Sequence, residues 1–373
     1  MTGQAIELRA VTKTFPGATA PAVAPLDLEL RAGEITVLIG PSGCGKTTTM
    51  RMINRLIEPT SGSITIGGVD IREQSTTELR RGIGYVIQQI GLFPHRTVAQ
   101  NIATVPSLLK WDGERTAARV AELAELVGID HDLLPRYPAE LSGGQQQRVG
   151  VARALAADPP VLLMDEPFGA VDPIVRAHLQ DELVALQERL HKTIVLVTHD
   201  VDEAVRLGDR VAVLNVGGLL EQVGPPDELL ASPATDFVAE FVGQEPSIKR
   251  LALARVGDLE LHDAPVVSLD AGVAAGCDVV SRAGGGWLGL LDGDRFAGWV
   301  PADEVSALAA DPTASLRDLH PQPPAAQVTP ESSLRQALEV ILTARSANAV
   351  VRNADGTFGG ILSLESIREG LAR

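Results

Sequence analysis

Eight consecutive residues near the N-terminus have the types and spacing that cradle a phosphate. They read Gly40, Pro41, Ser42, Gly43, Cys44, Gly45, Lys46 and Thr47. A predicted strand, 34–39, precedes them and a helical pattern, 46–57, follows, which is the context that this motif requires. Glycines allow backbone N–H groups to close around an anion at the positive end of a helix. Lys46 would then reach the β- and γ-phosphates of ATP, and the Thr47 hydroxyl would ligate Mg²⁺.

Two carboxylates stand at the end of a second apolar run. Residues 161–164 are all apolar, and Asp165 and Glu166 follow directly. A strand this apolar is buried, so a pair of acids at its tip indicates a function. Beside a phosphate-binding loop, this is where Mg²⁺ and the attacking water lie. We predict that Asp165 holds Mg²⁺, through water, and that Glu166 is the general base or orients the attacking water. A solvated strand end explains either acid alone but explains the pair poorly.

A third run of small and polar residues opens a helix that continues to Ala156. It comprises Leu141, Ser142, Gly143, Gly144 and Gln145. Ser142 can cap the helix, and the two glycines leave its first N–H groups open to an anion. Taken alone, this run is an ordinary helix start. Its position, about 20 residues before the acidic strand, makes it a specific signal.

These motifs lie in a stretch, residues 1–245, that alternates short apolar runs with helical patterns. That alternation is typical of an α/β domain with a largely parallel sheet. Edge strands are predicted at residues 6–11 and 26–30, and further strands at residues 34–39, 161–165, 193–198 and 211–214.

The remaining residues, 247–373, differ in character and contain a weak repeat. Glycine and alanine become frequent, and a proline-rich stretch lies at residues 321–324. Two segments, 292–300 and 355–362, follow the pattern strand, Asp-Gly turn, strand, and a helix is predicted after each. The pattern predicts a small tandem α+β domain. Its degenerate first repeat would span about 250–310 and its second about 316–373.

Composition limits the class of protein. The chain of 373 residues is too long for one ordinary core, and its 45% hydrophobic content excludes disorder. No apolar run approaches the roughly 20 residues of a membrane-spanning helix, and we see no secretory signal. Two cysteines fit a reducing compartment. A formal net charge of −16 disfavours binding to nucleic acid or anionic lipid. We therefore expect a cytosolic protein that contacts a membrane only through a partner.

The order of these motifs resembles that of the ABC ATPase family. The phosphate loop, the run 141–145, the Asp165–Glu166 pair and His199 after an apolar strand follow one another as they do there. The resemblance covers nearly all of residues 1–245. It implies a P-loop NTPase fold with a RecA-like core, an antiparallel β subdomain and a helical subdomain. It also implies a homodimer, in which the phosphate loop of one subunit and residues 141–145 of the other enclose one ATP.

The resemblance also assigns roles to single residues. Phe15 corresponds to the aromatic residue that stacks on adenine, with an ordinary core aromatic as the alternative. Gln88 corresponds to the glutamine that contacts Mg²⁺ and senses the transmembrane partner, and His199 to the histidine that contacts the γ-phosphate. With Glu166, these two residues form the predicted catalytic set. The phosphate loop, extended to Thr48, binds ATP within one subunit. The partner's ATP is contacted in trans by Ser142, Gly143, Gly144, Gln145 and Asp172.

Three further stretches, residues 48–62, 84–95 and 105–111, resemble the osmoprotectant branch of importers, which carry glycine betaine, choline, carnitine or proline betaine. The branch implies membrane permease subunits, an extracytoplasmic solute-binding protein and a peripheral position on the cytoplasmic side of the membrane.

Members of that branch often carry a C-terminal tandem CBS module, which residues 247–373 resemble. Such modules dimerise or bind adenine nucleotides, and a cyclic dinucleotide is one candidate ligand here. In such modules an acid near the positions of Asp303 and Glu365 commonly holds the ribose hydroxyls. We expect this region to regulate transport, with dimer reinforcement ranked ahead of nucleotide sensing. The region could also be a dimerisation scaffold alone.

Other interpretations of the motor domain stay open at this stage. The ATPase could serve an importer of another small solute, because the motor never touches the cargo. A soluble ABC protein that acts on nucleic acid or the ribosome is disfavoured by the single motor domain and the acidic charge. An exporter motor is disfavoured by the segment after Gln88 and by the C-terminal domain.

Overall fold

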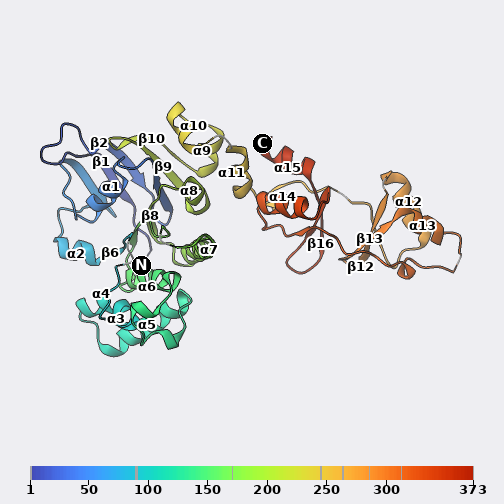
Figure 1. The fold of residues 1–373 in the computed structure, drawn as a ribbon, viewed down its shortest axis with the longest axis horizontal. Helices are drawn as coiled ribbons and strands as arrows, with labels where there is room; N and C mark the ends of the chain where they lie inside the picture. The colour runs from blue at the N-terminus through green and yellow to red at the C-terminus, as the bar shows by residue number, and fades with distance from the viewer. Residues whose placement is uncertain are drawn as a thin grey trace. The chain divides into compact units, whose positions relative to one another are not determined.

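The computed structural model describes residues 2–372 except 89–90, 170, 244–245, 263, 285 and 312. The chain divides into two compact units, Met1–Gln244 and Glu245–Arg373, whose elements are labelled in Figure 1. Gln89 and Ile90, which belong to one of the stretches singled out above, lie outside the described residues. No helix in the described part of the chain has both the length and the apolar character needed to cross a membrane.

A six-stranded sheet forms the centre of the first unit, in the order β10-β9-β3-β8-β7-β6. Its strands are β3 (Ile35–Ile39), β6 (Ile83–Val86), β7 (Val161–Asp165), β8 (Thr193–Val197), β9 (Arg210–Asn215) and β10 (Leu219–Gly224). All neighbouring pairs are parallel except β9 and β10. Every residue of β3, β7 and β8 is buried, as parallel strands covered on both faces should be. The predicted α/β core is therefore confirmed.

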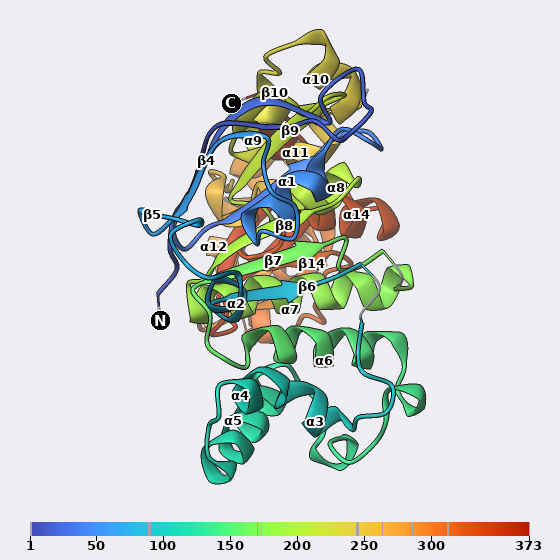
Figure 2. The ribbon, with the colours of Figure 1, turned by 90° about the vertical axis from the view of Figure 1, so that its left-hand side faces the viewer.

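Helices join these strands and position the loops at their carboxyl ends. α1 (Lys46–Ile53) follows β3, α7 (Pro173–Leu190) lies between β7 and β8, and α8 (Val201–Leu207) follows β8. Between β6 and β7 the chain forms a helical region, seen below the sheet in Figure 2. It contains α3 (Val98–Ile102), α4 (Thr104–Leu108), α5 (Gly113–Leu126), α6 (Gly143–Leu155) and the 3₁₀ turns His131–Leu133 and Pro138–Glu140. After β10 come α9 (Pro226–Ala231) and α10 (Asp236–Val242).

A separate antiparallel sheet, in the order β2-β1-β4-β5, packs on the same core. It comprises β1 (Ile6–Lys13), β2 (Val23–Leu30), β4 (Ser61–Ile66) and β5 (Val69–Asp70), and α2 (Thr76–Arg81) follows it. The prediction of two edge strands is wrong for β1, which pairs with β2 on one side and with β4 on the other. Because β4 comes much later in the chain, its pairing with β1 leaves no local signal.

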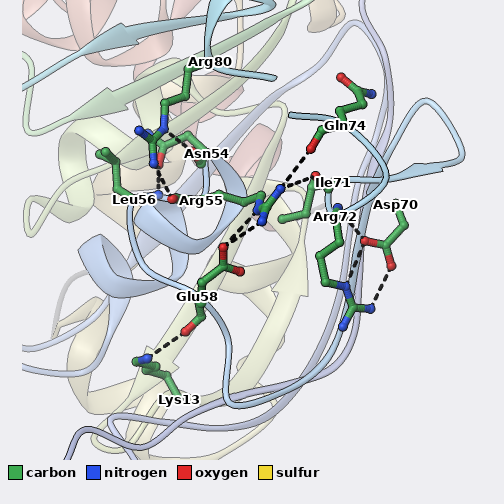
Figure 3. Close-up of polar contacts among 10 residues, drawn as sticks. All are labelled: Lys13, Asn54, Arg55, Leu56, Glu58, Asp70, Ile71, Arg72, Gln74 and Arg80. Atoms are coloured by element: carbon green, nitrogen blue, oxygen red, sulfur yellow. Dashed lines mark hydrogen bonds and ion pairs between the residues drawn. The ribbon is translucent and has the colours of Figure 1, made fainter. Parts of the chain in front are cut away.

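Helix α1 ends at Ile53 rather than at residue 57, and the contacts in Figure 3 show why. Arg55 has a left-handed backbone, with φ 53°, which a right-handed helix does not accommodate. The Asn54 side-chain oxygen accepts the N–H of Leu56 at 3.1 Å and closes the turn. The Arg55 guanidinium ties the helix end to the segment after β5. Its acceptors are the carbonyl oxygens of Ile71 and Gln74 and the carboxylate of Glu58.

The second unit contains two three-stranded sheets of the same topology. In each, a short strand runs parallel to the first strand of a hairpin, and a helix follows the hairpin. The first half comprises β11 (Val266–Ser268), α12 (Val273–Ala283), β12 (Trp287–Asp292), β13 (Arg295–Pro301) and α13 (Ala302–Leu308). The second comprises β14 (Gln327–Val328), α14 (Leu334–Thr343), β15 (Asn348–Arg352), β16 (Phe358–Ser363) and α15 (Leu364–Ala372).

The N-terminal segment of this unit packs in the half that lies farther along the chain. In sequence, α11 (Pro246–Leu253) and the turn Val256–Asp258 precede the first half, yet Leu251 is buried in the core of the second. The turn Leu316–Asp318 lies between the two halves in sequence and extends the half that it follows, since Leu316 is buried in the core of the first. Three short strands and their helices bury little apolar surface alone, so each half is enlarged by one such segment.

Candidate functional site

The phosphate loop leaves β3 at Gly40 and enters α1 at Lys46, so a buried strand and a helix fix both of its ends. Gly40 and Gly45 have positive φ angles of 149° and 97°. A side chain at Gly40 would place its Cβ 2.0 Å from the Leu214 carbonyl oxygen. At Gly45 the added Cβ would lie 2.6 Å from the Ala22 carbonyl oxygen. Both the backbone conformation and the close packing therefore require glycine at these positions.

Lys46 is 7% exposed and lies inside this loop rather than in solvent. Its Nζ donates to the carbonyl oxygens of Gly40, at 2.7 Å, and Pro41, at 3.1 Å. Neutral carbonyl oxygens stabilise a buried ammonium less than an anion does. The loop therefore fits an anionic ligand such as a phosphate.

Asp165 lies beside the loop at the end of β7 and is 4% exposed. Thr47 Oγ1, on α1, donates to Asp165 Oδ1 at 3.0 Å. Burial raises the pKa of the Asp165 carboxyl group above its usual value, and the charge of Glu166 adds to the shift. The Thr47 hydrogen bond and the charges of Arg51 and Lys46 lower that pKa and oppose the shift. A cation bound here would relieve the cost of the buried carboxylate.

The donor set at this position fits Mg²⁺. The described residues contain no cluster of three or more His, Cys, Asp or Glu that could hold a metal alone. Mg²⁺ at nucleotide sites does not need such a cluster, because one or two carboxylates, water and the phosphates complete its shell. The Thr47 hydroxyl and the Asp165 carboxylate are hard oxygen ligands of this kind, 3.0 Å apart.

Three of the predicted residues meet at the ends of adjacent strands. Gln88 follows β6, Glu166 follows β7 and His199 follows β8, and these strands are neighbours in the sheet. Gln88 Nε2 donates to Glu166 Oε2 at 2.8 Å, and His199 Nδ1 lies 3.4 Å from Glu166 Oε1. Glu166 has a positive φ of 45°, and its N–H donates to the Val197 carbonyl oxygen at 2.9 Å. The strand ends thus hold one carboxylate between an amide and an imidazole.

The starts of α6 and α7 form a second surface. Ser142 Oγ accepts the Gln145 N–H at 3.3 Å, and Gln145 Oε1 accepts the Ser142 N–H at 2.9 Å. The predicted cap of α6 is therefore a reciprocal capping box. Asp172 caps α7 through two N–H groups of its first turn. Gly144 lies against α7, since a Cβ added there would be 2.9 Å from Val175 Cγ1.

This second surface is not joined to the phosphate loop of the same chain. Ser142, Gly143 and Asp172 are exposed, and their hydrogen bonds among the described residues stay within their own helix starts. Ile174, two residues after Asp172, is 85% exposed. An isoleucine this exposed beside polar helix starts is a surface feature that an assembly could cover.

Phe15 and Cys44 differ in how they could contact a nucleotide. Phe15 follows β1, is 40% exposed and has Lys13 Nζ 5.2 Å from its ring centroid. That exposure disfavours the alternative that Phe15 is a core aromatic. The Cys44 side chain is fully buried in the core of the unit, so this residue supports the loop from behind.

A buried acid behind the site was missed by the sequence interpretation. Glu203, on α8, is 7% exposed, and its Oε1 accepts a hydrogen bond from Gln180 Nε2 at 3.1 Å. Burial raises the pKa of the Glu203 carboxyl group, against the effect of hydrogen bonds from Thr198 and Gln180. Because Thr198 directly precedes His199, Glu203 supports the segment that carries the histidine. A single glutamate on a short helix does not reveal this role in the sequence. The only signal is the apolar residues that follow it, which indicate that this part of the helix is buried.

Comparison with known proteins gives consistent matches. A family model described as ABC transporter matches residues 23–169. A glycine betaine/carnitine/choline transport ATP-binding protein of Bacillus subtilis is 56% identical over 266 residues, which are 71% of this chain and 70% of that protein. An osmoprotectant import ATP-binding protein of Salmonella typhimurium is 55% identical over 258 residues, 68% of this chain and 67% of that protein. A carnitine transport ATP-binding protein of Listeria monocytogenes is 47% identical over 297 residues, with shares of 79% and 74%.

Solved structures resemble the first unit. A dimeric bacterial ABC transporter cassette is 35% identical with a TM-score of 0.54, and the match covers 59% of this chain and 98% of that one. A component of an ABC transporter complex from Clostridium perfringens is 29% identical with a TM-score of 0.57, covering 61% of this chain and 91% of that one.

Proposed function

This chain belongs to the ABC transporter family of ATP-binding subunits, and we propose that it powers the import of a quaternary-amine osmoprotectant such as glycine betaine, choline or carnitine. Hydrolysis of ATP coupled to transport is the activity of this family. The solute is supported by relatives with 47–56% identity that are named for the transport of these compounds. The catalytic assignment depends on one observation above all, the Glu166 carboxylate held between Gln88 and His199.

We assign hydrolysis to this group of residues. Lys46 would neutralise the β- and γ-phosphate oxygens, and Thr47, Asp165 and the Gln88 side-chain oxygen would hold Mg²⁺. When bound, Mg²⁺ supplies charge neutralisation at the phosphates. Glu166 would then orient the attacking water and accept its proton. The Gln88 amide, 2.8 Å from Oε2, fixes the rotamer of that carboxylate, and His199 on its other side would contact the γ-phosphate.

The second surface belongs, in this proposal, to the partner's ATP. Ser142, Gly143, Gly144, Gln145 and Asp172 would face the phosphate loop of a second copy, so that a homodimer encloses two ATP molecules. The support is that these residues are exposed or half-buried and that, among the described residues, their side-chain hydrogen bonds stay within their own helix starts. The dimeric ABC cassette that resembles the first unit is consistent with this arrangement.

The segment after Gln88 is the proposed contact with a membrane permease. Phe93 is 39% exposed, which disfavours the alternative that it packs under the helical region. Its ring has Arg96 5.0 Å and Arg153 5.9 Å from the centroid, so a partner helix would meet an aromatic side chain flanked by two cations. The motor would thus lie on the cytoplasmic side of the membrane and work with permease subunits and an extracytoplasmic solute-binding protein.

Uptake by reconstituted vesicles tests the proposed solute. The vesicles contain this chain with the permease and the solute-binding protein encoded beside its gene. Radiolabelled choline should enter only with ATP on the side of the motor, and excess glycine betaine or carnitine should compete. A Lys46→Ala chain serves as the control without transport. ATP-dependent uptake of an unrelated solute, with no uptake of any quaternary amine, would overturn the solute assignment and leave the ATPase assignment intact.

The second unit is proposed to be a regulatory module of the tandem CBS type. The duplicated topology of its two halves and the packing of Leu251 in the second half, across the first in sequence, support this proposal. Like the sequence, the described residues of this unit show no cluster that could hold a metal. A scaffold that only reinforces the dimer remains the alternative.

A further inference from the structure

The second unit contains a cleft of about 580 Å³ between its two halves. Strands β12 and β13 of the first half and strands β15 and β16 of the second contribute to its lining, and the segment 322–326 completes it. Backbone bridges from Trp299 to Gln322 and from His262 to Ile361 fix the connecting segments beside these strands. A cleft of this volume accommodates a small organic molecule.

Two of the three tryptophans in the chain line this cleft. In the β12–β13 hairpin, Trp287 pairs with Pro301 and Trp299 pairs with Gly289. The two indoles therefore lie on one face of the hairpin as diagonal neighbours, close enough to flank one ligand. Trp287 is 47% exposed. The opposite face of the hairpin is buried in the core of the first half through Leu288, Leu290 and Val300.

The charges of the cleft disfavour a phosphorylated ligand. Its described lining residues include no Lys, Arg, Asp or Glu, whereas proteins bind phosphate mainly through Lys and Arg. Residues 245–373 contain 11 Lys and Arg against 17 Asp and Glu, so the unit as a whole repels anions. Asp303 and Glu365, the acids at the expected ribose position, are not among the described lining residues. The polar groups that line the cleft come from His262, Gln322, Ser346, Asn348 and Ser363.

The two indoles of the cleft also differ from other aromatic rings in the chain. Trp111 already has the Arg115 guanidinium 3.7 Å from its ring centroid, and Phe15 has the Lys13 ammonium at 5.2 Å. Within the part of the chain that the structure describes, no Lys or Arg lies over Trp287 or Trp299. Because a cation binds an indole face within about 6 Å, these two rings can accept an external cation.

We propose that this cleft binds a quaternary ammonium compound, with choline as the simplest case. The methylated ammonium would lie against the two indoles, where cation–π attraction replaces part of its hydration. The hydroxyl end of choline would meet the neutral polar groups of Ser346 and Asn348. The proposal rests on the proposed function, because the imported solute is the compound of this class that would accumulate beside the motor. The unit would then report the level of imported solute to the ATPase.

Isothermal titration calorimetry of the full chain with choline tests the proposal. The matched ligand control is 3,3-dimethyl-1-butanol, which has the shape of choline without its charge. Choline should bind, and the uncharged analogue should bind about tenfold more weakly or not at all. Trp287→Leu and Trp299→Leu should each weaken choline binding by about tenfold, and Trp299→Phe by less. Trp111→Phe, in the first unit, should leave the affinity unchanged, and thermal melting shows which variants are folded.

Three outcomes would overturn the proposal. These are equal binding of choline and its uncharged analogue, unchanged choline affinity in a folded Trp287→Leu chain, and binding of AMP but not choline at the cleft. AMP is titrated into a Lys46→Ala chain so that the phosphate loop does not contribute. The uptake assay separates the two proposals. If the chain transports choline but its cleft does not bind choline, only the proposed ligand of the cleft is refuted. If the cleft binds choline but no quaternary amine is transported, only the proposed transported solute is refuted.

Discussion

The two units bury polar groups in opposite ways. In the first, Lys46, Asp165 and Glu203 are charged or ionisable and 4–7% exposed. In the described part of the second unit, the buried polar side chains are two hydroxyls, Ser333 and Ser366. Burying a charge is costly unless an opposite charge or a metal ion joins it. The first unit is therefore suited to a charged nucleotide with its cation, and the second to a ligand held by aromatic and neutral groups.

If both proposals hold, hydrolysis and regulation use separate chemistry within one chain. The proposed hydrolytic residues lie at the ends of adjacent parallel strands, where one sheet edge brings them together. The cleft of the second unit instead lies where two similar halves face each other. Changes at the strand ends should therefore stop ATP hydrolysis, whereas changes in the cleft should alter only its control.

The largest expected effect is at Glu166. Glu166→Gln keeps the hydrogen-bonding shape between Gln88 and His199 but cannot take up a proton, so ATP hydrolysis should fall by about 10²–10⁴-fold. ATP binding should remain, and the variant should dimerise more strongly than the wild type because ATP stays trapped. Steady-state phosphate release and nucleotide binding measure the two effects. Trp287→Leu is the comparison from the other unit and should hydrolyse ATP normally. Near-normal turnover in Glu166→Gln would remove this residue from the catalytic step.

The next effect tests whether the two surfaces of the first unit act in trans. Lys46→Ala should weaken ATP binding by about 10–100-fold, since a charge-assisted bond to the phosphates is lost. Ser142→Arg should block the partner's site by bulk and charge. In a mixed dimer of the two chains both lesions fall on one composite site, so the other site should occlude ATP. Filter binding of labelled nucleotide measures this recovery, and mixed dimers that occlude no ATP would contradict the model.

The sequence allowed prediction of those parts of the site that are encoded locally. The phosphate loop requires glycines within a few residues of a strand end, and the Asp165–Glu166 pair directly follows an apolar run, so both are visible in a short window. The cap at Ser142 is local for the same reason, and the structure shows it as predicted. Contacts between residues on different strands of the sheet could not be predicted from short windows of sequence. Only the structure shows that Gln88, Glu166 and His199 lie within hydrogen-bond or ion-pair distance.

Apart from the early end of α1, which Asn54 and Arg55 cause locally, the features that were mispredicted or missed are non-local. β1 is an inner strand because β4, far along the chain, pairs with its free edge. Leu251 packs in the second half of the second unit although the whole first half separates the two in sequence. Glu203 has its polar partners on another helix and at the end of β8, and a lone glutamate usually faces solvent. Hydrophobic pattern and motif spacing carry no information about such pairings.

A smaller effect on hydrolysis is expected when the second unit is removed. A chain that ends at Gly243 keeps both sheets and the core of the first unit, so it should fold and dimerise with ATP. Its rate of ATP hydrolysis should stay within about twofold of the full chain, because domains of this size fold independently. Its reconstituted transporter should lose the response to internal solute. Loss of hydrolysis in a folded, dimeric truncated chain would show that the second unit contributes to catalysis.

The smallest expected effect concerns Glu203 and depends on pH. Burial raises the pKa of Glu203, so the folded chain binds this proton more tightly than the unfolded chain does. The stability from this group is therefore fully present below the unfolded pKa and is lost as the pH rises through the folded pKa. In Glu203→Gln the side-chain amide has the shape of the protonated carboxyl group and stays neutral at every pH. Its Tm should match that of the wild type near pH 5 and exceed it by less than about 4 °C at pH 8. Glu188→Gln, at an exposed position of α7, is the matched control for the exchange of a carboxylate for an amide. A Glu203→Gln chain that is equally destabilised at both pH values would show that the carboxylate is needed in its ionised form, as a charged support for the segment that carries His199.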